Sequence, residues 1–197
     1  MNYRRATPAD VQQIALLHAE SWRNSYRGML SDEFLDREVV ENRLAVWRSR
    51  LDSPVEGQFV LVAEENQRID GFICVFGNYD DKFGALLDNL HIRPDKQRRG
   101  LGKELMSRTA SWMEETYPES GLYLWVFASN EPAIRFYERL GAQMAGEKIE
   151  DEFGDKPVRA LRYVWTDVER LMKHFTTVRN KYFSPFYAPP KRGGDAS

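Results

Sequence analysis

The stretch DKQRRGLGKE, residues 95–104, places four cations and two glycines within ten residues of a chain whose net charge is only -2. The glycines stand two apart, directly before a segment with helical periodicity, which an ordinary basic loop does not require. A helix N-terminus presents free N–H groups and a positive dipole end, and glycine lets a bulky oxyanion approach the backbone. We therefore interpret this stretch as a cradle for an anion, with phosphate as the natural ligand.

The segment after the cradle is expected to form an amphipathic helix that runs to about Tyr117. At 100° per residue its apolar side chains occupy one half of the helix and its charged and small polar side chains the other. The apolar half contains Leu101, Leu105, Met106, Thr109, Ala110, Trp112 and Met113. This partition sets the helix start near Arg99 or Gly100, so both glycines stand at the N-terminus.

Two nearly continuous apolar stretches flank this helix, residues 84–94 (GALLDNLHIRP) and residues 122–127 (LYLWVF). Strands with this composition are covered on both faces, and a helix between two such strands favours a right-handed parallel crossover. Elsewhere the chain contains a hairpin pattern, so the sheet is expected to be mixed. The other expected elements are a strand at 1–6, a helix from the Thr7 cap and Pro8 to about Trp22, a helix at 39–51, hairpin strands at 58–66 and 69–80 with a turn at Gln67 and Arg68, a helix at 130–140 ended by Gly141, and strands at 143–153 and 158–165.

The composition indicates a globular protein of 197 residues with 28 Lys and Arg against 30 Asp and Glu. We expect one domain at residues 1–170 and a partly disordered C-terminal appendage at residues 171–197. Neither a signal peptide nor a membrane span is expected, which points to the cytoplasm. Cys74, the single cysteine, is interpreted as a buried thiol, and His18, His91 and His174 are too scattered for a metal site, so no metal is expected.

Two common phosphate-binding motifs do not fit the cradle. A P-loop that ends at Gly102 and Lys103 needs a glycine where Gln97 stands and a hydroxyl residue where Glu104 stands. A dinucleotide-binding G-x-G-x-x-G that starts at Gly100 needs glycine where Leu105 stands. The cradle therefore belongs to another class of phosphate site.

The residues 97–102, QRRGLG, match the pattern Q/R-x-x-G-x-G/A and resemble the acetyl-CoA signature of the GNAT family of N-acetyltransferases. Downstream, SNEPAIRFYERLGA, residues 129–142, is similar to the family segment N-x-x-A-x-x-x-Y-x-x-x-G, with Asn130, Ala133, Tyr137 and Gly141 in place. The resemblance implies an α/β (α+β) fold: a mixed, mostly antiparallel sheet of six to seven strands with a central β-α-β acetyl-CoA-binding unit and helices on both faces. It also implies a splay between the fourth and fifth strands.

The same resemblance implies how acetyl-CoA, the expected co-substrate, is held. The loop would bind the CoA pyrophosphate, the backbone of the fourth strand would pair with the pantetheine amides, and Asn130 with Ala133 would contact the cofactor near the next helix. A role for Asn130 as a helix cap is compatible with this. The expected cofactor-binding residues are Leu90, His91, Ile92, Gln97, Arg98, Arg99, Gly100, Leu101, Gly102, Lys103, Asn130, Ala133 and Tyr137.

Tyr137 falls on the apolar side of its helix, so its phenol points inward. One interpretation is a core tyrosine whose hydroxyl bonds a nearby carbonyl. The resemblance implies the other: the phenol faces the cofactor sulfur and protonates the departing thiolate. A thiol pKa of about 8.5 and a phenol pKa of about 10 allow this transfer where the site assists it.

The acceptor side is less defined by the sequence. Asp88 is the best carboxylate candidate for the base that deprotonates the amine, although the polar residues Asp88, Asn89 and His91 can also mark an exposed strand edge. Trp22, Tyr26 and Met29 are candidates for the acceptor pocket, with Asp32 or Glu33 to attract an amine, and Trp22 and Tyr26 can equally pack in the core. Arg93 is expected to be a surface cation.

The expected activity is transfer of an acetyl group from acetyl-CoA to a primary amine on a small molecule, a peptide N-terminus or a lysine, by direct attack in a ternary complex. The alternative is a non-catalytic acyl-CoA-binding regulator on the same fold. Nucleic-acid binding is disfavoured because the basic patch is small and the chain is slightly acidic. The expected partners are therefore acetyl-CoA and the amine, with neither nucleic acid nor membrane, and a homodimer is left open.

Overall fold

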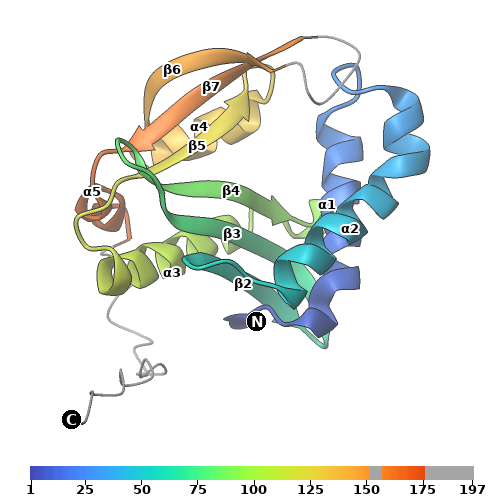
Figure 1. Ribbon diagram of the computed structural model, residues 1–197, viewed down its shortest axis with the longest axis horizontal. Helices are drawn as coiled ribbons and strands as arrows, with labels where there is room; N and C mark the ends of the chain where they lie inside the picture. The colour runs from blue at the N-terminus through green and yellow to red at the C-terminus, as the bar shows by residue number, and fades with distance from the viewer. Residues whose placement is uncertain (151–156, 176–197) are drawn as a thin grey trace, which may run out of the picture.

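The computed structural model describes residues 1–150 and 157–175, which form a seven-stranded sheet with helices on both faces (Figure 1). The strands lie in the order β1-β2-β3-β4-β5-β7-β6. Neighbours are antiparallel except β4 and β5, which are parallel. The mixed, mostly antiparallel sheet is thus confirmed. The strand bounds are β1 Asn2–Arg5, β2 Gln58–Glu65, β3 Arg68–Asp80, β4 Gly84–Ile92, β5 Leu122–Phe127, β6 Gln143–Glu150 and β7 Val158–Trp165.

The helices cover the sheet in two layers because side chains alternate between the faces of each strand. On one face, Val62 and Phe72 pack with residues of α1 and α2. On the other, Leu61 and Ile73 pack in the larger core, which α3, α4 and α5 complete. The helix bounds are α1 Val11–Ser25, α2 Val39–Asp52, α3 Leu101–Thr116, α4 Glu131–Arg139 and α5 Val168–Lys173.

β4 and β5 separate soon after they begin. Their parallel pairing consists of Ala85 with Leu122 and Leu86 with Tyr123, and beyond these pairs the two strands diverge (Figure 1). On its other edge β4 stays paired with β3, but the register shifts between Cys74 opposite Asn89 and Val75 opposite Leu87. Asp88 is therefore the extra residue of a β-bulge, which bends the strand where the separation starts.

Some local expectations need correction. The turn between β2 and β3 is formed by Asn66 and Gln67, both at positive φ, one residue earlier than expected. A π-helical segment, Phe34–Glu38, precedes α2 and was not anticipated, because such segments leave no periodic signature. Arg93 is not a free surface cation, since its guanidinium lies 3.0 Å from the buried carboxylate of Asp70.

The end of the fold extends beyond the expected domain boundary at residue 170, which falls inside α5. Leu171 and Phe175 are buried in the larger core. The rest of the expected appendage, residues 176–197, and the end of the strand expected to reach Phe153 lie outside the described residues. No helix in the described ranges combines the length and apolar character needed to cross a membrane.

Candidate active site

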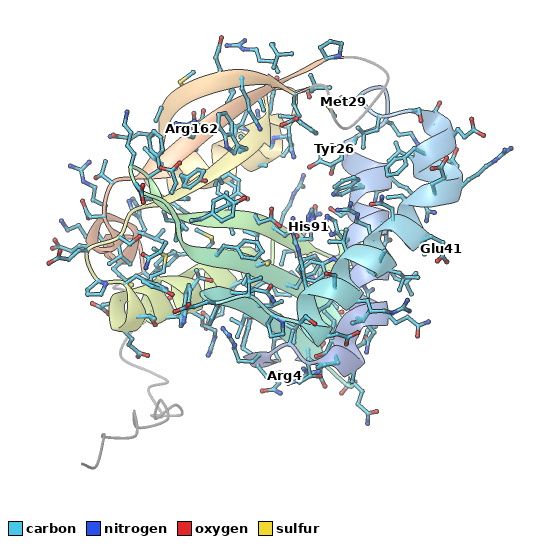
Figure 2. All side chains as sticks on the ribbon, in the orientation of Figure 1. Arg4, Tyr26, Met29, Glu41, His91 and Arg162 are labelled. Carbon is cyan, nitrogen blue, oxygen red and sulfur yellow. The ribbon has the colours of Figure 1, made fainter. Side chains whose placement is uncertain are left out.

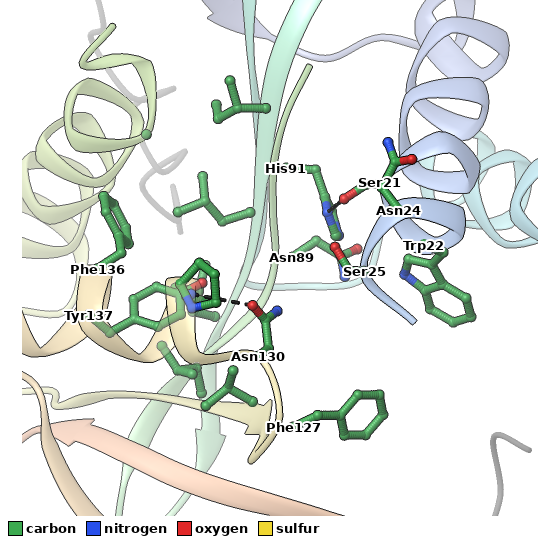
Figure 3. A pocket seen from close by; sticks show the side chains of 18 of the residues that line it. Ser21, Trp22, Asn24, Ser25, Asn89, His91, Phe127, Asn130, Phe136 and Tyr137 are labelled. Carbon is green, nitrogen blue, oxygen red and sulfur yellow. Dashed lines mark hydrogen bonds between the residues drawn. The ribbon is translucent and has the colours of Figure 1, made fainter. Parts of the chain in front are cut away.

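A cavity of about 1180 Å³ occupies the region where β4 and β5 diverge. Its lining comes from α1, α2, β4, the cradle, β5 and α4. In Figure 3, residues of α1 and His91 of β4 lie on one side, and Phe136 and Tyr137 of α4 lie on the other. The catalytic, cofactor-binding and acceptor residues expected from the sequence line this cavity, except Arg99, Met29, Asp32 and Glu33.

The cradle has the backbone geometry that the two glycines predict. Gly100 caps α3 at φ 86°, in the left-handed region where only glycine is unstrained. The Glu104 N–H donates to the Gly100 carbonyl at 3.0 Å, and the preceding N–H groups of the first turn have no partner within the helix. A Cβ at Gly102 would lie 3.4 Å from the Phe136 ring, so a side chain there would take up space in the cavity. These features fit an approaching pyrophosphate.

Tyr137 is buried, and its ring packs edge-on against Trp165, with 6.2 Å between the ring centroids. Its hydroxyl has no hydrogen-bond partner among the described residues, so no nearby carbonyl holds it. Burial, and then the neighbouring Tyr26 phenol, raise the pKa of Tyr137 well above its ordinary value. The phenol therefore carries its proton at neutral pH and faces the cavity.

Asn130 caps α4, because its side-chain oxygen accepts from the Ala133 N–H at 3.3 Å (Figure 3). This cap fixes the start of the helix that presents Tyr137 and leaves the Asn130 amide group in the cavity wall. On the opposite strand, Leu90, His91 and Ile92 line the cavity beyond the last β4–β5 pair. That edge of β4 is available for a ligand that pairs as a strand does.

A polar group that the sequence did not reveal surrounds His91 (Figure 3). The Ser21 hydroxyl and His91 Nδ1 lie 2.7 Å apart, and Asn24 and Ser25 line the same wall. Burial, then the charge of Arg43, lower the pKa of His91 to about 4, so its imidazole is neutral at pH 7. The serines stand four apart on α1, a pattern too common in exposed helices to indicate a site.

His18 lies behind His91, with 4.5 Å between the ring centroids. The Trp47 indole N–H donates to His18 Nδ1 at 2.9 Å, which leaves the proton of the neutral ring on Nε2. Burial holds the pKa of His18 well below its ordinary value. His91 thus lines the cavity, and the neutral ring of His18 packs against it from the buried side of α1.

Asp88 lies at the cavity but is already paired. Arg50 Nη1 donates to Asp88 Oδ2 at 2.6 Å and also to the Asn89 side-chain oxygen at 3.1 Å. The arginine therefore competes with an incoming amine for the carboxylate. Its role as a base stays a prediction.

The predicted acceptor residues separate into two groups. Trp22 and Tyr26 line the cavity, and Tyr26 packs on Phe127 at 5.0 Å between centroids. Met29 lies just beyond Tyr26 in Figure 2, and its sulfur accepts from the Ser129 hydroxyl at 2.8 Å. Asp32 and Glu33 do not line the cavity and are exposed ion-pair partners of Arg27 and Arg37, so the expectation that they attract an amine into it is not supported.

Within residues 1–150 and 157–175, no three His, Cys, Asp or Glu side chains are arranged to hold a metal ion. Cys74 is buried, and its pKa is raised by burial to about 12, which confirms the interpretation of an inert thiol.

Comparison with known proteins places this geometry in a family. The sequence model of the acetyltransferase (GNAT) family matches residues 19–142. The uncharacterized N-acetyltransferase YuaI of Bacillus subtilis (strain 168) is 27% identical over 174 residues, which cover 85% of this chain and 94% of that protein. A spermine/spermidine N(1)-acetyltransferase of the same organism is 37% identical over 76 residues, covering 37% of this chain and 50% of that protein.

A solved structure shares the fold. The PaiA N-acetyltransferase of Thermoplasma acidophilum, crystallised in complex with coenzyme A, has a TM-score of 0.63 at 21% sequence identity, covering 83% of this chain and 98% of that one. The chain belongs to the GNAT acetyltransferase family. It is an N-acetyltransferase whose co-substrate is acetyl-CoA, and the alternative of a non-catalytic regulator loses its support.

Proposed function

We propose that the protein transfers the acetyl group of acetyl-CoA to a primary amine by direct attack in a ternary complex. One observation carries the proposal: a single cavity is lined by the cradle, by α1 and α2, and by the Tyr137 hydroxyl, which has no partner among the described residues. Because the cradle and the α1 and α2 residues line the same cavity, it admits acetyl-CoA and the amine together, so no acyl-enzyme is required. The buried Cys74 lies outside the lining and offers no nucleophile.

The step balances without any further reactant. The neutral amine attacks the thioester carbonyl carbon, a C–N bond forms, and the oxygen becomes a tetrahedral oxyanion. Collapse breaks the C–S bond, and the thiolate takes the proton of Tyr137. The amine gives up one proton to a base or water, and one proton returns to the phenolate, so the products are the N-acetyl amine and free CoA.

Tyr137 suits the role of general acid because its phenol is protonated before the thiolate leaves. Its raised pKa keeps the phenol protonated over the physiological range. The departing thiolate forms in the same dry surroundings, where desolvation raises its own affinity for a proton. Burial therefore acts on donor and acceptor alike, and proximity decides the transfer.

β4 supplies the groups that we assign to stabilising the oxyanion and to accepting the amine proton. The bulge at Asp88 leaves backbone N–H groups at the bent strand without regular ladder partners, and we assign them to the oxyanion. Asp88 and His91 are the two side chains of β4 placed to accept the amine proton, directly or through water. Asp88 is tied to Arg50, whereas His91 is neutral and bonded to Ser21.

A panel of amines tests the proposal. Purified protein is mixed with acetyl-CoA and with amino acids, polyamines or short peptides, and free CoA is measured with a thiol reagent. The buried Cys74 gives a low background in this assay. Release of CoA with an acetyl mass increment on an amine supports the proposal. Tight acetyl-CoA binding by calorimetry, with no release from any amine, contradicts it.

A further inference from the structure

The charges at the acceptor end of the cavity do not cancel among the described residues. The lobe lined by α1, α2 and the bulge of β4 contains Arg43, Arg50 and Asp88. Arg50 and Asp88 form an ion pair at 2.6 Å. Arg43 forms no ion pair within the described part of the chain, so it leaves one positive charge.

The Arg43 guanidinium is held in place without being neutralised. It lies 4.1 Å from the centroid of the Trp22 ring, a cation–π arrangement, and its Nε, at 3.0 Å, and its Nη2 both donate to the Asn42 side-chain oxygen. Burial, and then the charge of Arg50, lower the pKa of Arg43 to about 10. Arg43 and His91 both line the cavity. An anion beside Arg43 would remove this unfavourable arrangement.

The other charged groups of the cavity lie outside this lobe or are paired: Arg98 and Lys103 belong to the cradle, and Arg139 belongs to α4. Lys96 pairs with Glu65 and Asp70, and Glu150 pairs with Lys148. Next to Arg43 the walls are aromatic: Trp22 and Tyr26 stand 5.5 Å apart between ring centroids. The lobe thus offers one cation, whose Nε–Nη2 edge is held by Asn42 and whose Nη1–Nη2 edge remains to donate to a ligand, and an apolar aromatic surface.

We propose that the acceptor is a small amine that also carries a carboxylate, an amino acid with an apolar side chain, and that Arg43 binds the carboxylate. The proposal rests on the acetyl transfer proposed above and adds the class of acceptor. The aromatic wall takes the side chain, and the amine is left to face the thioester. A polyamine fits poorly, because its additional cations would meet Arg43 and Arg50 with Asp88 as the nearest compensation.

Matched acceptors test this class. Phenylalanine and leucine are each compared with the decarboxylated amine and with the amino-acid amide, and spermidine is included. The amide is an informative control because it lacks the negative charge of the carboxylate. Its amine is less basic than that of the amino acid, so a larger fraction is neutral and able to attack at pH 7. We expect kcat/KM for the amino acids to exceed that of every counterpart without a carboxylate by at least about tenfold. Equal or better rates for the decarboxylated amines overturn the proposal.

Substitution of the arginine tests the residue. Arg43→Gln should raise KM for the amino acid by about 10- to 100-fold, the range for a hydrogen bond to a charged group, and should change KM for the decarboxylated amine little. Arg43→Lys keeps the positive charge but loses the planar guanidinium donors, so its KM for the amino acid should lie between those of the parent protein and Arg43→Gln. Arg48→Gln is the matched control, because Arg48 is exposed on α2 and does not line the cavity. An unchanged amino-acid KM in Arg43→Gln contradicts the assignment.

A binding measurement separates this proposal from acetyl transfer itself. Calorimetry follows phenylalanine binding to the protein saturated with CoA, which needs no turnover. If no amine is acetylated, the proposed reaction fails. Binding that is lost in Arg43→Gln and kept in Arg48→Gln would still support the carboxylate site, and absence of binding to the parent protein would overturn it.

Discussion

Gly100 and Gly102 serve the cradle in different ways. Gly100 has open space around its missing side chain but a φ of 86°, so the backbone conformation is what requires glycine. Gly102 has an ordinary helical position, where a Cβ would make an ordinary van der Waals contact with Phe136 at 3.4 Å, so neither strain nor crowding within the protein requires glycine there. Gly100 is thus required by its backbone conformation, whereas the missing side chain of Gly102 leaves room for a ligand at the first turn of α3.

Gly100→Asp should abolish measurable acetyl-CoA binding, whereas Gly100→Asn should weaken it much less. Both side chains have the same shape, and Asn and Asp tolerate the left-handed conformation better than other residues, so the difference isolates the negative charge beside the pyrophosphate. Isothermal calorimetry gives the two dissociation constants. Equal affinities in the two variants would show that the cradle does not bind the phosphates.

His18 and His91 are predicted to make stability depend on pH. Their folded pKa values lie below the ordinary 6.5, so the unfolded chain binds more protons between about pH 4 and 6.5. Stability should therefore be full above pH 6.5 and fall as the pH drops toward 4. In His91→Gln, urea unfolding across this range should show a shallower slope, by up to about one proton. An unchanged slope would indicate that His91 is protonated in the folded protein.

At the scale of elements, the start of the cradle is tied to β3 by one buried carboxylate. Asp70 is fully buried and lies 3.0 Å from both Arg93 Nη1 and Lys96 Nζ, while its carbonyl accepts from the Arg93 N–H at 2.9 Å. Both cations belong to the turn that precedes the glycines. The pairing therefore fixes where the strand ends and where the loop toward α3 begins.

Asp70→Asn should weaken the contacts that hold the loop before the cradle, although Asp70 itself does not line the cavity. Two half-buried cations lose their common partner, so the free energy of unfolding should fall by about 3 kcal/mol. The dissociation constant of acetyl-CoA should rise about tenfold or more, with kcat at saturation little changed. Glu65→Gln is the control, because Glu65 pairs with Lys96 from an exposed position. Parent-like affinity in Asp70→Asn would show that the loop holds its shape unaided.

For the whole molecule, local patterns predicted the elements and tertiary contacts decided the site. The partition of residues 101–117 and the two motifs located α3, α4, Gly100 and Tyr137, because those signals are short-range. The Ser21–His91 contact, the Arg43–Trp22 stack and the Asp70–Lys96 pair join residues far apart in the sequence, and nothing in a single sequence couples them. Asp88 was correctly placed at the cavity, but its partner Arg50 comes from another element.

The splay of β4 and β5 brings the cradle, α1 and α4 around one cavity. It opens the cavity between the sheet halves, exposes an unpaired edge of β4, and lets α1 and α4 face each other across it (Figure 3). The mechanism proposed above assigns protonation of the leaving thiolate to the phenol of Tyr137. Removing the Tyr137 oxygen alone therefore separates chemistry from binding.

The decisive measurement is single-turnover acetyl transfer by Tyr137→Phe beside the parent protein, with an acceptor from the panel. Tyr163→Phe is the control, because the Tyr163 hydroxyl bonds Glu138 and does not line the cavity. We predict that Tyr137→Phe loses about 10²- to 10⁴-fold in rate, with the dissociation constant of acetyl-CoA nearly unchanged, and that Tyr163→Phe transfers acetyl at about the parent rate. Transfer by Tyr137→Phe at the parent rate, where chemistry limits, would contradict the assignment and leave Tyr137 as a packing residue.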